Sequence, residues 1–242
     1  MSGVSEHIIV PRATFPRSPL FYDPVLSLTW AAAVTKRVRL GTSVLVLPLR
    51  HPLPLAKELA TLQNFSDGRL ILGAGVGCLE AEFAALGAPF DERGRRTDEG
   101  IAMMRAVWTQ DPVTFRSRYI PAEITEMTMS PPPVRPIPIW FGARSDAVKR
   151  TVGIGDGWHG SQLTAEEAAP VVKRLRSERP EPEFTVSMRT HWNGKDEGEL
   201  RERVAAFGKV GVQHVMVHPV NRDIDDWDEV IEGVGRVAAR AS

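Results

Sequence analysis

Small residues that leave the backbone open to a ligand follow several short apolar runs of this 242-residue chain. They fall where we predict the carboxyl ends of strands: Gly75 and Gly77, Gly142 and Ala143, and Asp156 and Gly157. In a parallel barrel, that end of the strands holds the active site. Strand-to-helix turns favour glycine for conformational reasons alone, so the clustering by itself leaves a ligand site and ordinary turns equally open.

The stretch "FGARS" (141–145) combines several features of a phosphate site. Gly142 and Ala143 would let backbone N–H groups approach a ligand, and Arg144 offers a forked cation. Ser145 is placed to cap the next predicted helix, whose positive end favours phosphate. We therefore predict phosphate binding at this loop.

Aromatic residues also lie near predicted strand ends, at Trp140, Phe141 and Trp158. Because a small barrel must fill its interior with side chains, core packing is the favoured interpretation for Trp140. Trp158 stands beside Gly157 and could form the wall of a site for a planar ring.

Histidines supply the candidate acid/base groups. His7 stands just before "IIV", His51 lies in a proline-flanked loop, and His159 is near a strand end. An isolated histidine is more often structural than catalytic, so position alone does not assign a role. Two ligands on a zinc-binding helix need close spacing, which no histidine pair has, and the sole cysteine excludes a thiolate cluster. We predict no metal site.

Sequence motifs for protein-based nucleophiles are absent: the chain has no G-x-S-x-G elbow and no Walker-type G-x-x-x-x-G-K. The stretch "GAGVG" has glycines at 73, 75 and 77, but Cys78 stands where a dinucleotide fingerprint needs its third glycine, which disfavours a nicotinamide site. By elimination, the chemistry is assigned to a bound organic cofactor that the protein positions.

The strands and helices that must position these residues are predicted to alternate regularly along the chain, and this alternation indicates a parallel sheet. Seven strands are predicted, over residues 7–10, 38–48, 69–77, 137–143, 156–161, 184–190 and 212–219. Helices are predicted over 23–36, 52–64, 80–86 and 95–108, and from residues 145, 165, 197 and 225. The proline-rich segment 111–138 is predicted to be irregular and to form a lid or rim. We expect a single domain over 1–242, a (β/α) barrel that lacks one of its usual eight units.

Composition excludes several classes of protein. The apolar share of 43% and the charged share of 25% are ordinary for a soluble globular domain. Thirty basic residues balance thirty acidic ones, so no net field attracts nucleic acid or an anionic membrane. A single cysteine fits a reducing compartment, and neither a secretory signal nor an apolar run of membrane-spanning length is present. We expect a cytoplasmic protein.

Long segments of the chain resemble the luciferase-like monooxygenases, especially the branch that uses the deazaflavin coenzyme F420. The resemblance is carried by "SEH", "DPVLSLTWAAAVTKRVRLGTSVLVLPLRHPLPLAKELATLQNFSDGRLILGAGVG", "EFAALGAPFDERGRRTDEGIAMMRAVWTQDPVTF", "PIWFGARSDAVKR" and "GDGWH". These segments run in family order from about residue 5 to about residue 160. They imply an α/β fold, the (β/α)8 TIM barrel of the bacterial luciferase-like type, with an insertion after its fourth strand.

The resemblance also implies roles for individual residues. His7 is similar to a histidine beside the reactive face of the cofactor ring, where it would move a proton. The remaining implied positions are cofactor-binding: Thr42 and Ser43 at a cis peptide bulge under the ring, Gly75, Val76 and Gly77 near the cofactor tail, and Gly142, Ala143, Arg144 and Ser145 with Asp156, Gly157 and Trp158 in phosphate-holding loops.

Three departures from the family pattern accompany these similarities. The family's first strand, its helix and most of its second strand precede the "SEH" segment and are not in this sequence, which implies about seven β/α units. A start assigned too late, a partner that fills the gap, and a degenerate family member are the alternatives, because an open barrel exposes strand edges. Cys78 replaces a commonly aromatic residue, and Ala143 replaces the second glycine of a Gly-Gly pair.

The leading hypothesis is an F420-dependent oxidoreductase that transfers hydride between the deazaflavin and a small organic substrate, with His7 as acid/base. The first alternative is an FMN-dependent monooxygenase that uses O2. An alternative of another class is a non-catalytic barrel that lost activity. A homodimer is expected from the family and from the need to cover exposed strand edges.

Overall fold

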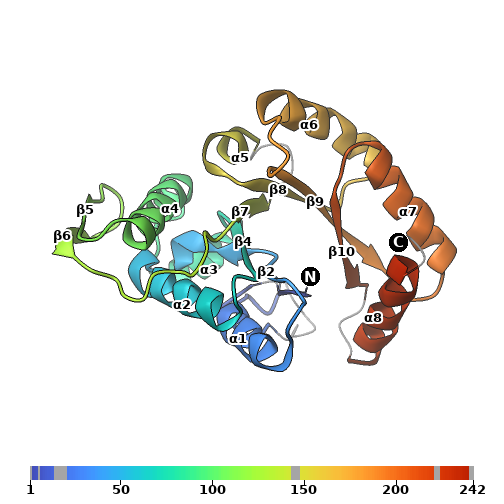
Figure 1. The fold of residues 1–242 in the computed structure, drawn as a ribbon, viewed down its shortest axis with the longest axis horizontal. Coiled ribbons are helices and arrows are strands. Elements are labelled where there is room, and N and C mark those ends of the chain that lie inside the picture. The colour runs from blue at the N-terminus through green and yellow to red at the C-terminus, as the bar shows by residue number, and fades with distance from the viewer. Residues whose placement is uncertain (1, 5, 14–20, 143–147, 221–223, 240–242) are drawn as a thin grey trace. The chain divides into compact units, whose positions relative to one another are not determined.

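The structure, a computed structural model, describes residues 2–4, 6–13, 21–142, 148–220 and 224–239. It divides into two compact units, Met1–Ile139 and Trp140–Ser242. Figure 1 shows the elements of both units in chain order.

Unit 1 contains a parallel sheet of short strands. Its strands are β1 (Ser2–Val4), β2 (Leu40–Thr42), β3 (Leu45–Val46) and β4 (Leu70–Gly75). Their order is β1-β2-β4, and β3 also pairs with β4. β2 and β3 are one predicted strand that is interrupted, because Gly41 pairs with Ile71 whereas Leu45 pairs with Ala74. The extra residue is a bulge at Ser43, and such irregularities in a strand re-aim the chain at functional edges.

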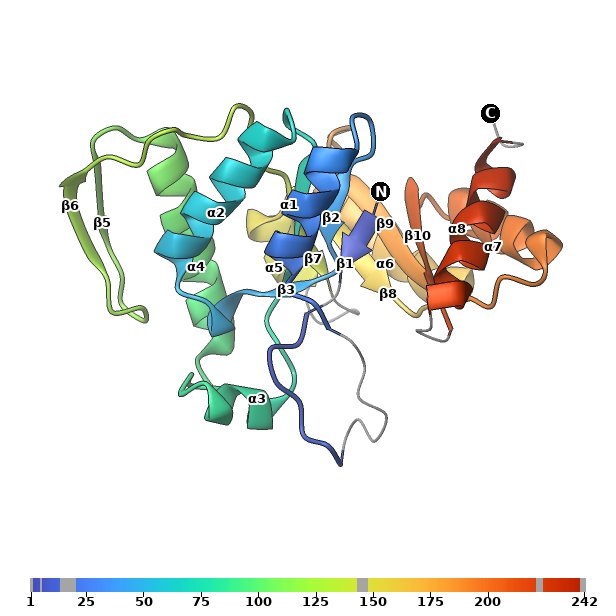
Figure 2. The same ribbon diagram turned by 90° about the horizontal axis from the view of Figure 1, so that it is seen from below.

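The helices of unit 1 begin either at a side-chain cap followed by a proline or without a side-chain cap. They are α1 (Pro24–Val34), α2 (Pro52–Phe65), α3 (Glu80–Ala85) and α4 (Arg93–Thr109), and a 3-10 turn, η1, covers Leu47–Leu49. The Asp23 carboxylate accepts a hydrogen bond from the Leu26 amide at 2.9 Å, and Pro24 takes the first helical position. His51 caps α2 by accepting from the Leu53 amide at 3.3 Å, which is a structural role. Figure 2 shows α1, α2 and α4 side by side.

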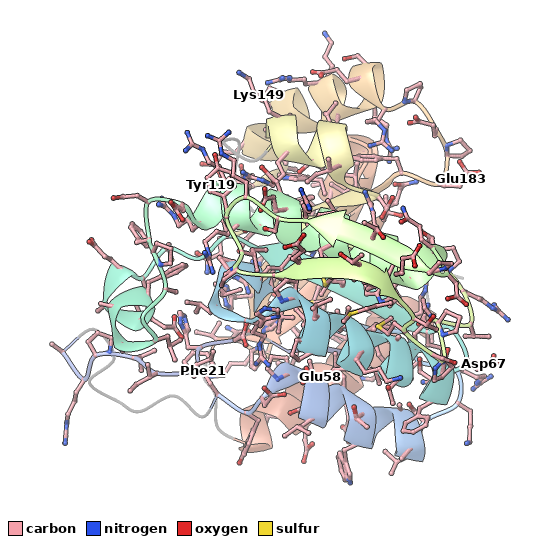
Figure 3. All side chains as sticks on the ribbon, turned by 90° about the vertical axis from the view of Figure 1, so that its left-hand side faces the viewer. Phe21, Glu58, Asp67, Tyr119, Lys149 and Glu183 are labelled. Atoms are coloured by element: carbon pink, nitrogen blue, oxygen red, sulfur yellow. The ribbon has the colours of Figure 1, made fainter. Side chains whose placement is uncertain are left out.

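The segment 111–138 is more regular than predicted. It contains an antiparallel ribbon of β5 (Val113–Arg116) and β6 (Glu123–Met127). The turn of this ribbon, where Tyr119 is labelled in Figure 3, is fastened to α4. The Glu99 carboxylate accepts hydrogen bonds from the amides of Arg118 and Tyr119, and Arg96 donates to the Tyr119 carbonyl. The prolines that suggested an irregular loop lie mostly after β6, which explains the error.

Unit 2 continues the alternation of strand and helix. Its strands are β7 (Ile139–Gly142), β8 (Gly157–Ser161), β9 (Thr185–Trp192) and β10 (His214–Pro219), paired in this order and parallel. Its helices are α5 (Val148–Ile154), α6 (Ala165–Glu178), α7 (Glu197–Lys209) and α8 (Ile224–Ala239). Figure 1 shows α6 and α7 along the outside of β8 and β9. The strand residues on the helix side form an apolar core that includes Trp158, Val186 and Met188 together with Phe207 of α7.

The prediction of a first strand over residues 7–10 is wrong. β1 occupies Ser2–Val4, and residues 7–10 follow it as a loop in which Ile8 and Ile9 are exposed. A short β-branched run resembles a strand in sequence whether or not a neighbour pairs with it. The correction places His7 after the carboxyl end of β1.

Candidate functional site

The carboxyl ends of the unit 1 strands carry most of the predicted site residues. Thr42 is the last residue of β2, Gly75 is the last residue of β4, and His7 lies three residues beyond β1. Val76 and Gly77 continue from β4, and Gly77 has a φ of +80°, which favours glycine. Because parallel strands end at one edge, these positions lie at the same edge of the sheet.

His7 is held by a buried carboxylate that the sequence did not predict. The imidazole Nδ1 lies 2.9 Å from Oε2 of Glu82, a residue of α3 that is 2% exposed. The other carboxylate oxygen, Oε1, accepts hydrogen bonds from the amides of Ile8 at 2.6 Å and Ile9 at 3.3 Å. Phe21 packs edge-on against the imidazole, with ring centroids 4.9 Å apart. One carboxylate therefore fixes both the ring and the backbone that follows it.

This arrangement selects one tautomer of His7. A carboxylate can only accept hydrogen bonds, so Nδ1 must carry a proton and donate to Glu82. Nε2 is then the nitrogen with the lone pair that can take up a proton. A histidine whose Nδ1–H is bonded to a buried carboxylate is the arrangement of a general base, because the carboxylate orients the ring and stabilises the imidazolium.

A second buried carboxylate anchors the preceding residue. Glu6, which is 5% exposed, accepts hydrogen bonds from the Val46 amide at 2.6 Å and from Nε of Arg50 at 2.7 Å. Arg50 also donates to the Asp23 carboxylate at 2.6 Å. Burial raises the pKa of Glu6 above its ordinary value, although the Arg50 guanidinium opposes the shift. The network ties the segment before His7 to β3 and to the start of α1.

Thr42 ends β2, Ser43 follows it, and the peptide bond from Ser43 to Val44 is cis, as the resemblance implies. The role of these two residues in binding a cofactor stays a prediction. Both side chains are buried. The Thr42 hydroxyl donates to the Gly73 carbonyl at 2.7 Å. A Cβ added at Gly73 would lie 2.0 Å from the Thr42 carbonyl oxygen, so this pair of strands requires a glycine there. Any contact of Thr42 with a ligand would come from its backbone.

The predicted phosphate-binding residues of unit 2 divide into three groups. Gly142 ends β7, as predicted. Ala143, Arg144 and Ser145 lie outside the described residues. Asp156 and Gly157 were predicted at a carboxyl end of a strand, which is wrong, because Gly157 is the first residue of β8 and pairs with Trp140.

Packing explains both the glycine at 157 and the position of Trp158. A Cβ on Gly157 would lie 2.6 Å from the Trp140 ring and 2.7 Å from the Thr185 carbonyl oxygen. Trp158 has no exposed surface and packs in the apolar core with Val186. Its ring is a core element of unit 2 and not the wall of a site, which corrects the sequence interpretation.

The other face of the unit 2 sheet carries a row of polar side chains. His159, Ser187 and His214 are cross-strand partners on β8, β9 and β10. The Ser187 hydroxyl lies 2.9 Å from Nδ1 of His159 and 2.7 Å from Nδ1 of His214. Burial lowers the pKa of His159 to about 3, and the positive charge of Arg189 adds to this shift. His159 is therefore a neutral, structural histidine.

Sequence reasoning missed Glu82, Glu6 and Arg50. Glu82 meets His7 across 75 positions in the chain, and Glu6 meets Arg50 across 44. No local spacing signals such contacts. The one available signal was that Glu82 follows the glycines of β4 and so stands close to the predicted edge.

The described residues lack two features, a metal-binding cluster and a membrane-spanning helix. No group of three or more His, Cys, Asp or Glu residues in this part of the chain could hold a metal ion. Among the helices that the structure describes, none combines the length and apolar character needed to cross a membrane.

A family model described as luciferase-like monooxygenase matches residues 4–232. The chain belongs to the luciferase-like monooxygenase family. The resemblance read from the sequence is thus confirmed, and so is the prediction of the luciferase-like TIM-barrel fold with about seven parallel strands.

Relatives of this luciferase-like chain include proteins with and without an assigned activity. An uncharacterized protein of Mycobacterium bovis is 37% identical over 227 residues, which are 90% of this chain and 76% of that protein. An F420-dependent glucose-6-phosphate dehydrogenase of Amycolatopsis mediterranei is 36% identical over 183 residues, or 70% of this chain and 53% of the dehydrogenase. The chain spans between half and two thirds of the length of several curated relatives that it matches.

Solved structures share the fold. An F420-dependent secondary alcohol dehydrogenase, in complex with an F420–acetone adduct, has a TM-score of 0.78 and 18% identity, and the match covers 96% of this chain and 89% of that chain. The monooxygenase RslO1 from Streptomyces bottropensis has a TM-score of 0.64 and 25% identity, with coverage of 90% and 65%.

Proposed function

We propose that this luciferase-like protein is an F420-dependent oxidoreductase that acts in the cytoplasm on a small organic substrate. In this proposal His7 exchanges a proton with the substrate while hydride passes between the substrate and the deazaflavin. Relatives named as F420-dependent dehydrogenases support the choice of cofactor. The observation that carries the proposal is the His7–Glu82 pair at the carboxyl ends of the unit 1 strands.

The residues at this edge fit an organic redox cofactor. They offer one imidazole for proton exchange, and no metal cluster occurs among the described residues. No protein side chain donates hydride, so the redox step has to come from a bound group. F420 supplies that hydride chemistry when bound. The protein contributes the oriented base, the cis bulge at Ser43 and the glycine-rich end of β4.

His7 would act through Nε2. Oxidation of an alcohol to a carbonyl removes the hydroxyl proton together with a hydride from carbon. Nε2 accepts that proton, and Glu82 stabilises the positive charge that forms on the ring. In the reverse direction, the same nitrogen returns the proton to the carbonyl oxygen.

The phosphate group of the cofactor is proposed to bind at Gly142, Ala143, Arg144 and Ser145. Gly142 stands at the carboxyl end of β7, which supports this assignment. Of the unit 2 positions that were predicted, Asp156, Gly157 and Trp158 are not part of the proposed site. Asp156 directly precedes β8, Gly157 begins it, and Trp158 fills the core.

A turnover assay tests the proposal. The change in F420 absorbance is followed with a panel of secondary alcohols and sugar phosphates, since relatives and structural neighbours are named for such substrates. His7→Asn removes the base while keeping a polar side chain, and His51→Asn on the exposed start of α2 is the control. We expect turnover in the native protein and in His51→Asn, and loss of turnover in His7→Asn. Equal rates in all three proteins would exclude His7 as the base.

An FMN-dependent monooxygenase is the second candidate, favoured by the fold shared with RslO1. It predicts oxygen consumption with reduced FMN and substrate. A non-catalytic barrel predicts no response to either cofactor.

A further inference from the structure

The face of the unit 2 sheet that is turned away from α6 and α7 is polar along its whole length (Figure 1). Side chains alternate between the two faces of a strand, so this face carries every second residue of β8, β9 and β10. One row across it is the hydrogen-bonded set of His159, Ser187 and His214. Branched apolar side chains normally fill such layers of a parallel barrel, so the polar rows are a departure that packing alone does not explain.

Two further rows of this face lie closer to the carboxyl ends of the strands. Ser161 is the cross-strand partner of Arg189, and His191 is the partner of His218. The Ser161 hydroxyl accepts hydrogen bonds from Nε of Arg189 at 3.2 Å and from Nη2 at 2.8 Å, so it orients the guanidinium. The rings of His191 and His218 lie edge to face with their centroids 6.2 Å apart. We call Ser161, Arg189, His191 and His218 the basic site.

Positive charge gathers at the basic site, and the strands that build it supply no negative charge. β8, β9 and β10 contain no Asp or Glu. Burial is the main cause that lowers the pKa of His159 to about 3, and the positive charges of Arg189 and, less strongly, of His218 add to it. Cations held on one face repel one another, so an anion bound among them stabilises the arrangement.

The basic site is accessible and has the donors that an oxyanion needs. All four of its side chains are partly exposed, whereas His159 and Ser187 in the row below are buried. The carboxyl ends of parallel strands are where such sheets bind their ligands. The planar fork of an arginine matches two oxygens of a carboxylate or phosphate, and an imidazole N–H can donate to a further oxygen.

We propose that the basic site binds an oxyanion group of the substrate, either a phosphate monoester or a carboxylate. The Arg189 guanidinium donates to this group, His191 and His218 donate from the adjacent row, and Ser161 holds the guanidinium in place. The assignment of the oxyanion to the substrate rests on the proposed oxidoreductase function. The binding of an oxyanion at these residues does not rest on it.

Titration of the full chain with inorganic phosphate and, separately, with acetate tests the site without any cofactor. Ionic strength is held constant with sodium chloride. The ring signals of His191 and His218 in long-range ¹H–¹⁵N NMR spectra are expected to shift until the site is saturated, while those of His51, at the exposed start of α2, stay unchanged. Tighter binding of phosphate assigns a phosphate monoester, and tighter binding of acetate assigns a carboxylate. No shift of the two rings, or a shift that chloride alone reproduces, would overturn the proposal.

Variants of Arg189 test the residue that carries the charge. Arg189→Met keeps an unbranched side chain but removes the cation, and is expected to raise the dissociation constant of the preferred anion by at least about 10-fold. Arg189→Lys keeps the charge without the fork, and a smaller rise is expected. Arg174→Met is the matched control, because Arg174 is an exposed arginine on α6 of the same unit. Circular dichroism checks that each variant is folded. An unchanged dissociation constant in Arg189→Met, or an equal rise in Arg174→Met, would overturn the proposal.

Turnover with F420 separates the basic site from the oxidoreductase function. The ratio of kcat/KM for an alcohol that carries the preferred anionic group to kcat/KM for its neutral analogue is expected to fall by at least about 10-fold in Arg189→Met. An unchanged ratio would overturn the placement of the substrate's oxyanion at this site. Anion binding by a native protein that gives no turnover with F420 would contradict the oxidoreductase function and leave the oxyanion site standing.

Discussion

Replacement of Glu82 by glutamine changes the group behind His7 while it preserves the shape of the side chain. The carboxamide has one accepting oxygen and one donating nitrogen. The oxygen can remain at the Oε1 position, where the amides of Ile8 and Ile9 donate. The nitrogen then occupies the Oε2 position, 2.9 Å from Nδ1 of His7. Two donors cannot pair, so the imidazole proton must move from Nδ1 to Nε2.

The expected loss of stability follows from the three hydrogen bonds that the Glu82 carboxylate accepts. Bonds to charged groups contribute about 1.5–3 kcal/mol each and neutral bonds about 0.5–1.5 kcal/mol. Because the geometry survives, we expect the free energy of unfolding to fall by about 1–3 kcal/mol. Turnover falls more severely, since Nε2 now carries a proton and cannot accept one. When the carboxylate behind a general-base histidine is replaced by an amide and the ring takes the wrong tautomer, kcat falls by about 10⁴-fold.

Long-range ¹H–¹⁵N NMR of the histidine rings reads the tautomer without any need for turnover. The native protein is expected to show Nδ1–H at His7, and Glu82→Gln is expected to show Nε2–H. Glu80→Gln is the matched control, since Glu80 is exposed on the same helix. The reasoning is refuted if His7 keeps its Nδ1 proton in Glu82→Gln, or if the native ring already carries its proton on Nε2.

Three further predictions concern stability, each measured by urea unfolding. The pKa of His159 is lowered from 6.5 to about 3, so below pH 6.5 the unfolded chain binds more protons than the folded one and stability falls as the pH falls. Between pH 7 and pH 5 the free energy of unfolding of the native protein should fall by about 2 kcal/mol more than that of His159→Gln. Equal losses in the two proteins would contradict the lowered pKa of His159. Gly157→Ala should destabilise the protein by about 1–3 kcal/mol because an added Cβ has no room. Gly153 has open space around it, so Gly153→Ala should be neutral or stabilising. Equal effects of the two substitutions would contradict this account of packing. Arg50→Met should lower the free energy of unfolding by about 3–5 kcal/mol, because the charge of Glu6 is left buried without its cation. Adding Glu6→Gln should recover part of that loss. No recovery would mean that the charge of Glu6 is not the cause.

Local patterns predicted most of the fold. The caps at Asp23 and Asp196 and the capping box at Thr164 begin helices within a residue or two of the predicted positions. The apolar run before Gly75 forms β4 as expected. Short segments were harder to predict, because pairing depends on a neighbour that is distant in sequence. Residues 7–10 resemble a strand but find no partner, while the ribbon of β5 and β6 carries little apolar alternation.

The candidate site was predictable only in part. Resemblance located His7, and the cis bulge after Ser43 agrees with it. The residues that give His7 its orientation were not predictable, because Glu82 and Glu6 act through contacts across dozens of positions. Asp156 and Gly157 were assigned to the wrong end of a strand, since a glycine that makes room for Trp140 looks the same in sequence as one that turns the chain.

Cofactor binding tests the central claim most directly. The purified protein is titrated with F420 and, separately, with FMN, and fluorescence and thermal stability are followed together. The account predicts micromolar binding of F420 with a rise in melting temperature, and little response to FMN. Preference for FMN would contradict the assignment of the cofactor, and binding of neither would contradict the assignment of this chain as an oxidoreductase.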